Sequence, residues 1–140
     1  MPLTAARRTE KLSDLGFRDV PVAAGVICYA GGQAVINATG YAAPATTATG
    51  LKAAGKFLDT VDNSGGLDGA ETVRIECDSA YPWANSSGAD EITQANVGDT
   101  VFMVDDETVA LTDGGGTRSP AGEVFQVNNQ GVYVLPTLRG

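Results

Sequence analysis

At residues 72–78 the sequence reads TVRIECD, a strict alternation of apolar and polar side chains. This alternation places Val73, Ile75 and Cys77 on one face and polar residues on the other, as in a β-strand with one buried face. Residues 62–69, just before it, read DNSGGLDG and are rich in residues that favour tight turns. We therefore expect a turn followed by an amphipathic strand that covers a hydrophobic core.

The same pattern of short apolar segments separated by turn residues continues on both sides of this stretch. Towards the C-terminus we expect strands at residues 100–104, 108–112, 123–127 and 132–135. Towards the N-terminus we expect a hairpin formed by residues 22–29 and 34–38 around Gly31 and Gly32, a loop or weak strand at 39–49, and a short strand within 51–61. This pattern predicts an all-β domain over residues 21–140, either a small antiparallel β-barrel or a β-sandwich.

Composition supports this fold class and limits the classes of partner. The 140 residues are 43% hydrophobic but only 6% aromatic and include 18 glycines, which suits small side chains packed on sheets and disfavours long helices. The formal net charge of -8 repels phosphate backbones, so we expect no nucleic-acid partner. No apolar run approaches the roughly 18 residues of a membrane span or follows the first residues as in a signal peptide, so we expect a soluble protein made in the cytoplasm, without a membrane partner.

The first 20 residues differ in charge from the rest of the chain. They contain four basic and three acidic side chains, a net charge of +1, which leaves -9 on the remainder. We interpret residues 1–20 as an extended arm that becomes ordered on a partner; a disordered terminus is the alternative. The candidate contact residues of this arm are Arg7, Arg8, Lys11, Leu12, Leu15, Phe17 and Arg18.

The residues that usually carry chemistry form no recognisable constellation. The sequence contains no histidine, so Ser-His-Asp and Cys-His machinery cannot be assembled. Cys28 and Cys77 lie among apolar strand residues and are expected to be buried thiols. We expect no enzyme, no metal and no cofactor.

Two loops offer alternatives to this expectation. The acidic runs at Asp105–Glu107 and at Asp62, Asp68 and Glu71 do not have the spacing of a calcium loop, so solvated turns are expected; a carboxylate-dependent hydrolase that uses Asp105 or Glu107 is the enzymatic alternative. Residues 114–119 superficially resemble a phosphate-binding loop, but Pro120 follows them in place of a helix. We therefore expect a flexible break there.

One aromatic cluster is a candidate for contact with a partner. Tyr81, Pro82 and Trp83 lie at the start of residues 79–96, which we interpret as an exposed connection. Tyr and Trp dominate binding hot spots, so Tyr81 and Trp83 are possible contact anchors. The alternative is that Trp83 folds back to cap a small core.

The order of these segments resembles that of phage head decoration, or capsid cement, proteins. That family typically runs from a Gly-Asp pair through a strand, an acidic turn, a short strand and a strand opened by glycine to a final strand. The segments that carry the resemblance are residues 97–105, 109–112, 121–125 and 132–134, together with 22–27 and 34–35 as an opening hairpin, in all about two thirds of the chain.

The resemblance implies a small β-barrel or β-sandwich on the outside of a mature icosahedral phage head. It would be a structural virion protein that binds the major capsid protein and ties neighbouring subunits together. It implies a symmetric oligomer, for which we expect a homotrimer with a dimer as the alternative. A β-rich tail, fibre or baseplate module of a phage particle is the alternative function.

Overall fold

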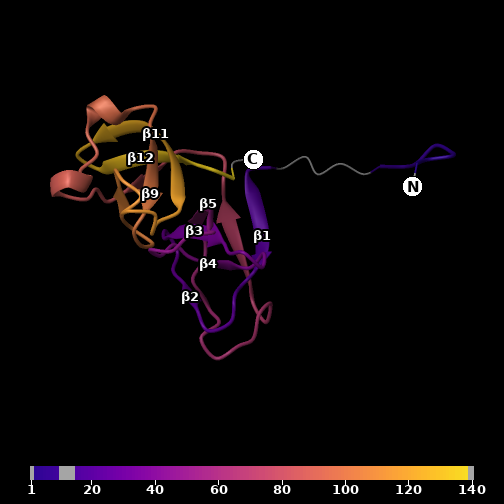
Figure 1. Ribbon diagram of the computed structural model, residues 1–140. Helices are drawn as coiled ribbons and strands as arrows, with labels where there is room; N and C mark the ends of the chain where they lie inside the picture. Colours follow the sequence, from indigo (N-terminus) through magenta and orange to yellow (C-terminus); the bar gives the residue numbers. More distant parts are fainter. Residues whose placement is uncertain (1, 10–14, 139–140) are drawn as a thin grey trace.

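The computed structural model of the chain describes residues 2–9 and 15–138 and is all-β. Two five-stranded antiparallel sheets form the body, and a two-stranded ribbon accompanies the first sheet. Figure 1 shows the two sheets as two lobes, with the N-terminal segment drawn out to one side. The described residues contain no α-helix, only two short 3-10 turns, at Gly88–Asp90 and Gln94–Asn96.

Each sheet draws its strands from one half of the chain. The first sheet contains, in spatial order, β1 (Phe17–Pro21), β7 (Thr72–Glu76), β5 (Lys52–Phe57), β3 (Gln33–Ile36) and β4 (Ala42–Pro44). The second contains β10 (Val109–Ala110), β9 (Thr100–Met103), β11 (Pro120–Asn128), β12 (Gly131–Pro136) and β8 (Tyr81–Trp83). The ribbon pairs β2 (Ile27–Cys28) with β6 (Val61–Asp62).

In each sheet a single bridge joins segments that lie at the two opposite edges. In the second sheet, which forms a half-barrel, a parallel bridge joins Ala84, just after β8, to Thr108, just before β10. The Val109 amide donates to the Ala84 carbonyl at 2.9 Å. In the first sheet a parallel bridge joins Val22 to Ala42 in the same way. Each bridge pairs the backbone of the two edges at one point.

The alternation at residues 72–78 is confirmed as an amphipathic strand. In β7 the side chains of Val73 and Ile75 are buried, whereas Thr72 and Arg74 are exposed. Cys77 continues the buried face, and both Cys28 and Cys77 are buried free thiols, as the sequence predicted.

Buried hydrophobic side chains form two clusters, one for each sheet. The alternating residues of β3 explain how the clusters adjoin: Ala34 packs in the first cluster and Val35 in the second. In β5, Ala54 and Ala53 divide in the same way, beside an irregularity in the strand register. Strands buried on both faces cannot show a polar face, which is why this region reads as a run of small apolar residues.

The hairpin predicted around Gly31 and Gly32 is wrong. The segment before the two glycines, β2, pairs with β6, and the segment after them, β3, pairs with β4 and β5. The Gly31 amide donates to the Phe57 carbonyl at 2.8 Å, so the glycines carry the chain from the ribbon into the sheet. Residues 39–49, for which we expected a loop or weak strand, contain the three-residue strand β4, and the strand expected within 51–61 is confirmed as β5.

The C-terminal strands follow the prediction closely. β10 pairs with β9 across the acidic turn, and β11 pairs with β12 across a tight reversal in which Asn128 lies opposite Gly131. Gly122 allows β11 and β12 to approach at a close point: its φ is 138°, and a Cβ atom there would lie 1.8 Å from the Leu135 carbonyl oxygen. Only glycine fits this position without a shift of the backbone.

Candidate functional site

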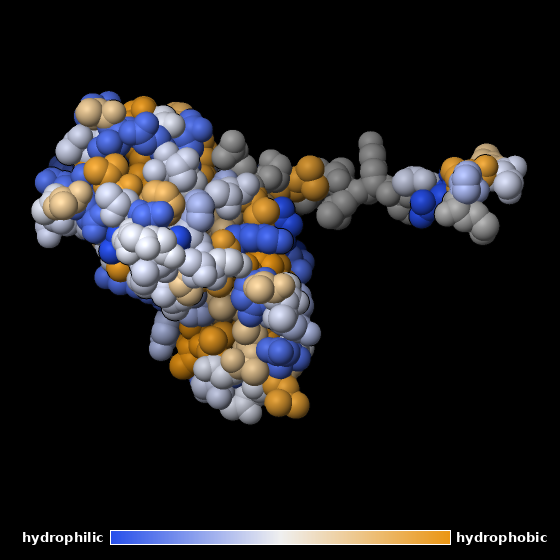
Figure 2. Space-filling model, in the orientation of Figure 1, coloured by the Kyte–Doolittle hydropathy of each residue, from blue (hydrophilic) through white to orange (hydrophobic). Residues whose placement is uncertain are grey.

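The first part of the predicted arm is exposed. Every residue from 2 to 9 is exposed, including Arg7 and Arg8, and none belongs to a strand. Figure 2 shows this segment outside the packed body. Lys11 and Leu12, which were also predicted to contact a partner, lie outside the described residues.

The end of the predicted arm belongs to the body, so the boundary at residue 20 is wrong. Phe17 and Arg18 lie in β1, which pairs with β7 from residue 17 onward. The Arg74 guanidinium donates to both carboxylate oxygens of Asp19, at 3.0 and 3.2 Å, and lies 5.5 Å from the centre of the Phe17 ring. The backbone amide and carbonyl groups on this side of β7 take their hydrogen bonds from residues 17–21. These residues therefore form a strand, where we predicted the end of a free arm.

Leu15 marks the point at which the chain joins the body. Its side chain is 52% exposed, but its carbonyl oxygen accepts a hydrogen bond from the Cys77 thiol at 3.2 Å. Of the predicted contact residues that the structure describes, Arg7 and Arg8 thus lie in the exposed segment, whereas Leu15, Phe17 and Arg18 lie on or beside the first sheet.

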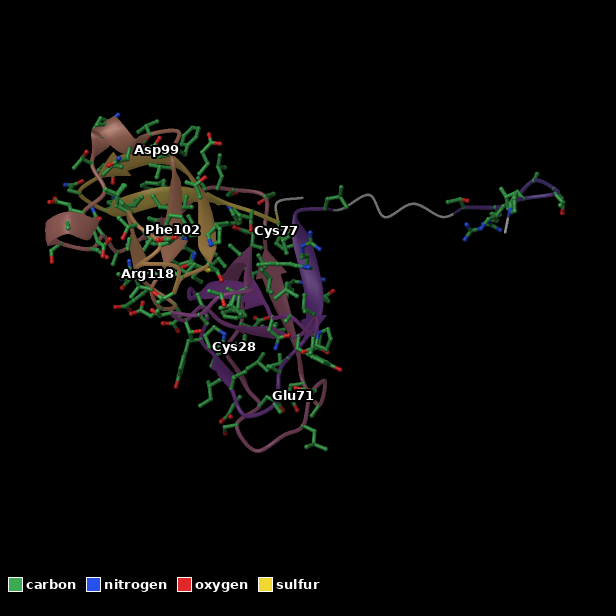
Figure 3. The ribbon with its side chains drawn as sticks, viewed as in Figure 1. Cys28, Glu71, Cys77, Asp99, Phe102 and Arg118 are labelled. Atoms are coloured by element: carbon green, nitrogen blue, oxygen red, sulfur yellow. The ribbon has the colours of Figure 1, made fainter. Side chains whose placement is uncertain are left out.

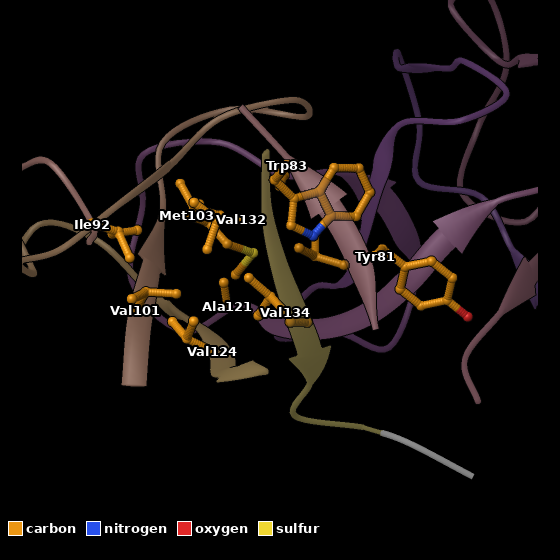
Figure 4. Close-up of a cluster of buried hydrophobic side chains, with 13 residues drawn as sticks. Tyr81, Trp83, Ile92, Val101, Met103, Ala121, Val124, Val132 and Val134 are labelled. Carbon is orange, nitrogen blue, oxygen red and sulfur yellow. The ribbon is translucent and has the colours of Figure 1, made fainter. Parts of the chain in front are cut away.

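Tyr81 and Trp83 are not exposed contact anchors, and the connection predicted at residues 79–96 begins with a strand. Both residues lie in β8 with their side chains in the second cluster, only 4% and 5% exposed, and the intervening Pro82 faces outward. Figure 4 shows Trp83 beside Val132 and Val134 of the second sheet, with the Tyr81 ring at the margin of the cluster. Burial, followed by the nearby negative charge of Glu76, raises the pKa of Tyr81 to about 12. The alternative interpretation, in which Trp83 caps a core, is confirmed.

The acidic turn between β9 and β10 borders a surface hollow. The Asp105 carboxylate accepts a hydrogen bond from the Glu107 amide at 2.9 Å, which is the geometry of a turn. The hollow has a volume of about 420 Å³ and is lined by residues 29–32, Asp106 and Glu107. Within residues 2–9 and 15–138, no three Cys, Asp or Glu side chains are placed to hold a metal ion together.

The glycine-rich segment at residues 114–116 is a hydrogen-bonded turn and not the flexible break that we predicted. The backbone amides of Thr117 and Arg118 both donate to the Asp113 carbonyl. The Arg118 guanidinium donates to the Asp90 carboxylate at 3.2 Å and to the Thr112 carbonyl at 3.0 Å. Hydrogen bonding from the Thr112 side chain, and then from Arg118, lowers the pKa of Asp90 below its ordinary value. Asp90 is 28 positions from Arg118, so local sequence gave no signal of this contact.

The turn at residues 62–69 contains a feature that the sequence interpretation missed. Asn63 is only 2% exposed, and its side-chain amide donates to the carbonyl oxygens of Ala23 at 2.9 Å, Leu67 at 3.0 Å and Val22 at 3.3 Å. Leu67, by contrast, is 81% exposed. A Leu among turn residues was the only sequence signal, and we interpreted the segment through its glycines and aspartates.

The chain was also compared with known proteins and searched for membrane-spanning helices. No protein-family model, curated protein or solved structure matches the chain. No helix among the described residues is long and apolar enough to cross a membrane.

Proposed function

We propose that this chain is a structural protein of a phage particle that binds the exterior of the capsid and stabilises contacts between major capsid subunits. It acts as a homotrimer, needs no cofactor, and is made in the host cytoplasm before it joins the virion. The proposal starts from the resemblance of residues 97–105, 109–112, 121–125 and 132–134, together with 22–27 and 34–35, to capsid cement proteins.

One structural observation supports the proposal: a packed all-β body is accompanied by an exposed segment, residues 2–9, that belongs to no strand. The body has its sheet edges joined by the bridges Val22–Ala42 and Ala84–Thr108. The segment at residues 2–9 extends outside it (Figure 1). This construction suits a protein that presents a fixed surface and attaches through a short extension, since such segments bind by becoming ordered on a partner.

Charge divides along the same boundary. Residues 2–9 contain Arg7 and Arg8 and no acidic side chain, whereas the whole chain has a net charge of -8. The exposed segment therefore fits an acidic groove on a capsid subunit, and the acidic body keeps neighbouring copies from associating without order. Several modest contacts made at once by a trimer give strong net attachment.

The test is co-sedimentation of the full-length chain with mature, undecorated heads assembled from the major capsid protein encoded nearby, followed by imaging of the pellet. We expect saturable binding with density on local three-fold axes. Absence of binding to matured heads would refute the proposal, and density on the tail of a complete particle would support the tail or fibre alternative.

The role of the exposed segment needs its own variants. Deletion of residues 2–9 should abolish head binding and leave the thermal unfolding temperature unchanged, because this segment contributes no strand. Arg7→Ala/Arg8→Ala should weaken binding, and the matched variant Lys52→Ala/Lys56→Ala, which removes the same charge from β5, should not. Full binding after the deletion would exclude this segment as the attachment point.

A further inference from the structure

Leu67 is the most exposed large hydrophobic residue in the part of the chain that the structure describes. Its side chain is 81% exposed, compared with 61% for Phe125 on the second sheet. It belongs to the tip of the first lobe, which we define as residues 22–28 and 61–71. Figure 2 shows hydrophobic surface at the end of this lobe, and Figure 3 shows Glu71 there, well apart from Asp99 and Phe102 on the other lobe.

The backbone that presents Leu67 is firmly held. Its carbonyl oxygen accepts hydrogen bonds from the buried Asn63 side chain and from the Ala70 amide, both at 3.0 Å. One residue later, the Asp68 carboxylate accepts a hydrogen bond from the Ala24 amide at 2.8 Å. A leucine on a fixed turn loses little backbone freedom when it binds, which favours its use as a preorganised contact.

Charge on the tip has one sign. Its three charged side chains, Asp62, Asp68 and Glu71, are all carboxylates. Hydrogen bonding from Ser64 lowers the pKa of Asp62, so this group stays ionised at neutral pH. The partner surface that complements the tip is therefore an apolar socket with a rim of Lys or Arg side chains.

This charge pattern favours a different protein over a second copy of the chain. Two tips brought together would place six carboxylates near two leucines, whereas self-association through other surfaces of the chain would leave the tips apart. Like charges across an interface are strongly unfavourable. A subunit of the shell with basic side chains around an apolar depression meets both requirements.

We infer that the tip is a docking element in which Leu67 enters a basic-rimmed apolar socket on the capsid shell. This inference rests on the function proposed above and adds a second attachment point to the exposed segment at residues 2–9. The carboxylates of Asp62 and Asp68 orient the tip, and Leu67 supplies the desolvated contact.

The experiment compares full-length variants for binding to mature undecorated heads by quantitative co-sedimentation. Leu67→Ser should weaken the apparent affinity roughly tenfold or more, the scale of a hot-spot side chain. Phe125→Ser, the matched loss of an exposed apolar side chain on the other lobe, should bind like the unmodified chain. Asp62→Asn/Asp68→Asn retains the side-chain oxygens that accept from Ser64 and Ala24, and it should weaken binding at low salt but not at high salt.

The outcomes separate this inference from the proposed function. If the unmodified chain binds heads and Leu67→Ser binds equally well, the docking role of the tip is wrong and the proposed function stands. Equal losses from Leu67→Ser and Phe125→Ser would also overturn it. If the unmodified chain does not bind heads, both ideas fail together. Thermal unfolding of Leu67→Ser should match that of the unmodified chain, because the replaced side chain is exposed.

Discussion

Replacement of Asn63 should destabilise the first lobe, and by more with aspartate than with alanine. The Asn63 side-chain amide donates to three backbone carbonyls, two of them at 2.9 and 3.0 Å and the third at 3.3 Å. Each such hydrogen bond contributes about 0.5–1.5 kcal/mol, and a buried acceptor left without a donor costs about 1–3 kcal/mol. We therefore expect Asn63→Ala to lower the free energy of unfolding by about 2–4 kcal/mol.

Asn63→Asp removes the same donors and adds a repulsive term. A carboxylate oxygen in place of the amide nitrogen would face the three carbonyl oxygens, so the free energy of unfolding should fall by about 4 kcal/mol or more at neutral pH. This surrounding raises the pKa of the introduced carboxyl above its unfolded value of about 3.9. The excess loss over Asn63→Ala should therefore be greatest above the folded pKa and should shrink as the pH falls through it towards the unfolded value.

Urea unfolding followed by two probes measures both effects. Trp83 fluorescence reports on the second cluster, and reaction of the buried Cys28 thiol reports on the first. With a slope of about 2 kcal/mol per M urea, the middle of the usual range, the loss for Asn63→Ala corresponds to a midpoint shift of roughly 1–2 M.

A matched variant controls for asparagine replacement as such. Asn128→Asp keeps the oxygen that accepts from the Gln130 amide on an exposed turn, so its free energy of unfolding should change by no more than about 0.5 kcal/mol. Equal stability of Asn63→Asp and Asn63→Ala at neutral pH would refute the reasoning about the three carbonyls.

Three further outcomes follow from the structure. Gly122→Ala should lower the free energy of unfolding by about 3 kcal/mol or more, because its Cβ would lie 1.8 Å from the Leu135 carbonyl oxygen. The control is Gly65→Ala, which has open space around it and should change the free energy of unfolding by less than about 0.5 kcal/mol in the same urea assay. The Cys28 thiol, buried and with its pKa raised to about 11, should react with Ellman's reagent at pH 8 only as fast as the chain opens; prompt reaction in the folded state would contradict this burial. Because the pKa of Asp90 is lower in the folded chain, its ionised carboxylate stabilises the fold fully above pH 3.8, and this stabilisation is lost as the pH falls through the folded pKa. Asp90→Asn should therefore make stability depend less on pH below about pH 4, as followed by circular dichroism during acid unfolding.

The sequence predicted correctly those strand pairs whose two strands follow each other directly in the chain. β9 with β10 and β11 with β12 join strands that are neighbours in the chain, so periodicity and turn residues were enough to predict both hairpins. β1 with β7 and β2 with β6 join distant segments, and periodicity contains no information on which distant strand is the partner. For this reason we extended the predicted arm to residue 20, although β1 begins at residue 17, and we predicted a hairpin around Gly31 and Gly32 that does not form.

The candidate site was predicted unevenly for a related reason. Residues 2–9 could be recognised as distinct from the body by their charge, because they contain two arginines and the chain as a whole is acidic. Tyr81 and Trp83 read as a polar connection because β8 has only three residues, too few to establish an alternation. The hold on the Leu67 backbone was overlooked because the Asn63 side chain binds carbonyls from two separate parts of the chain, Val22 and Ala23 in one and Leu67 in the other.

The pairing of β1 with β7 also governs when this protein can fold during its synthesis. Asp19 and its partner Arg74 are 55 positions apart, so at about 5–20 residues per second the ribosome needs roughly 3–11 s to deliver β7 after β1. The amide of Leu138 donates to the carbonyl of Ala53 at 2.9 Å, a contact that forms only after residue 138 has been made. The first lobe, although its strands are made first, thus gains its contact with Leu138 only after the strands of the second lobe have been made.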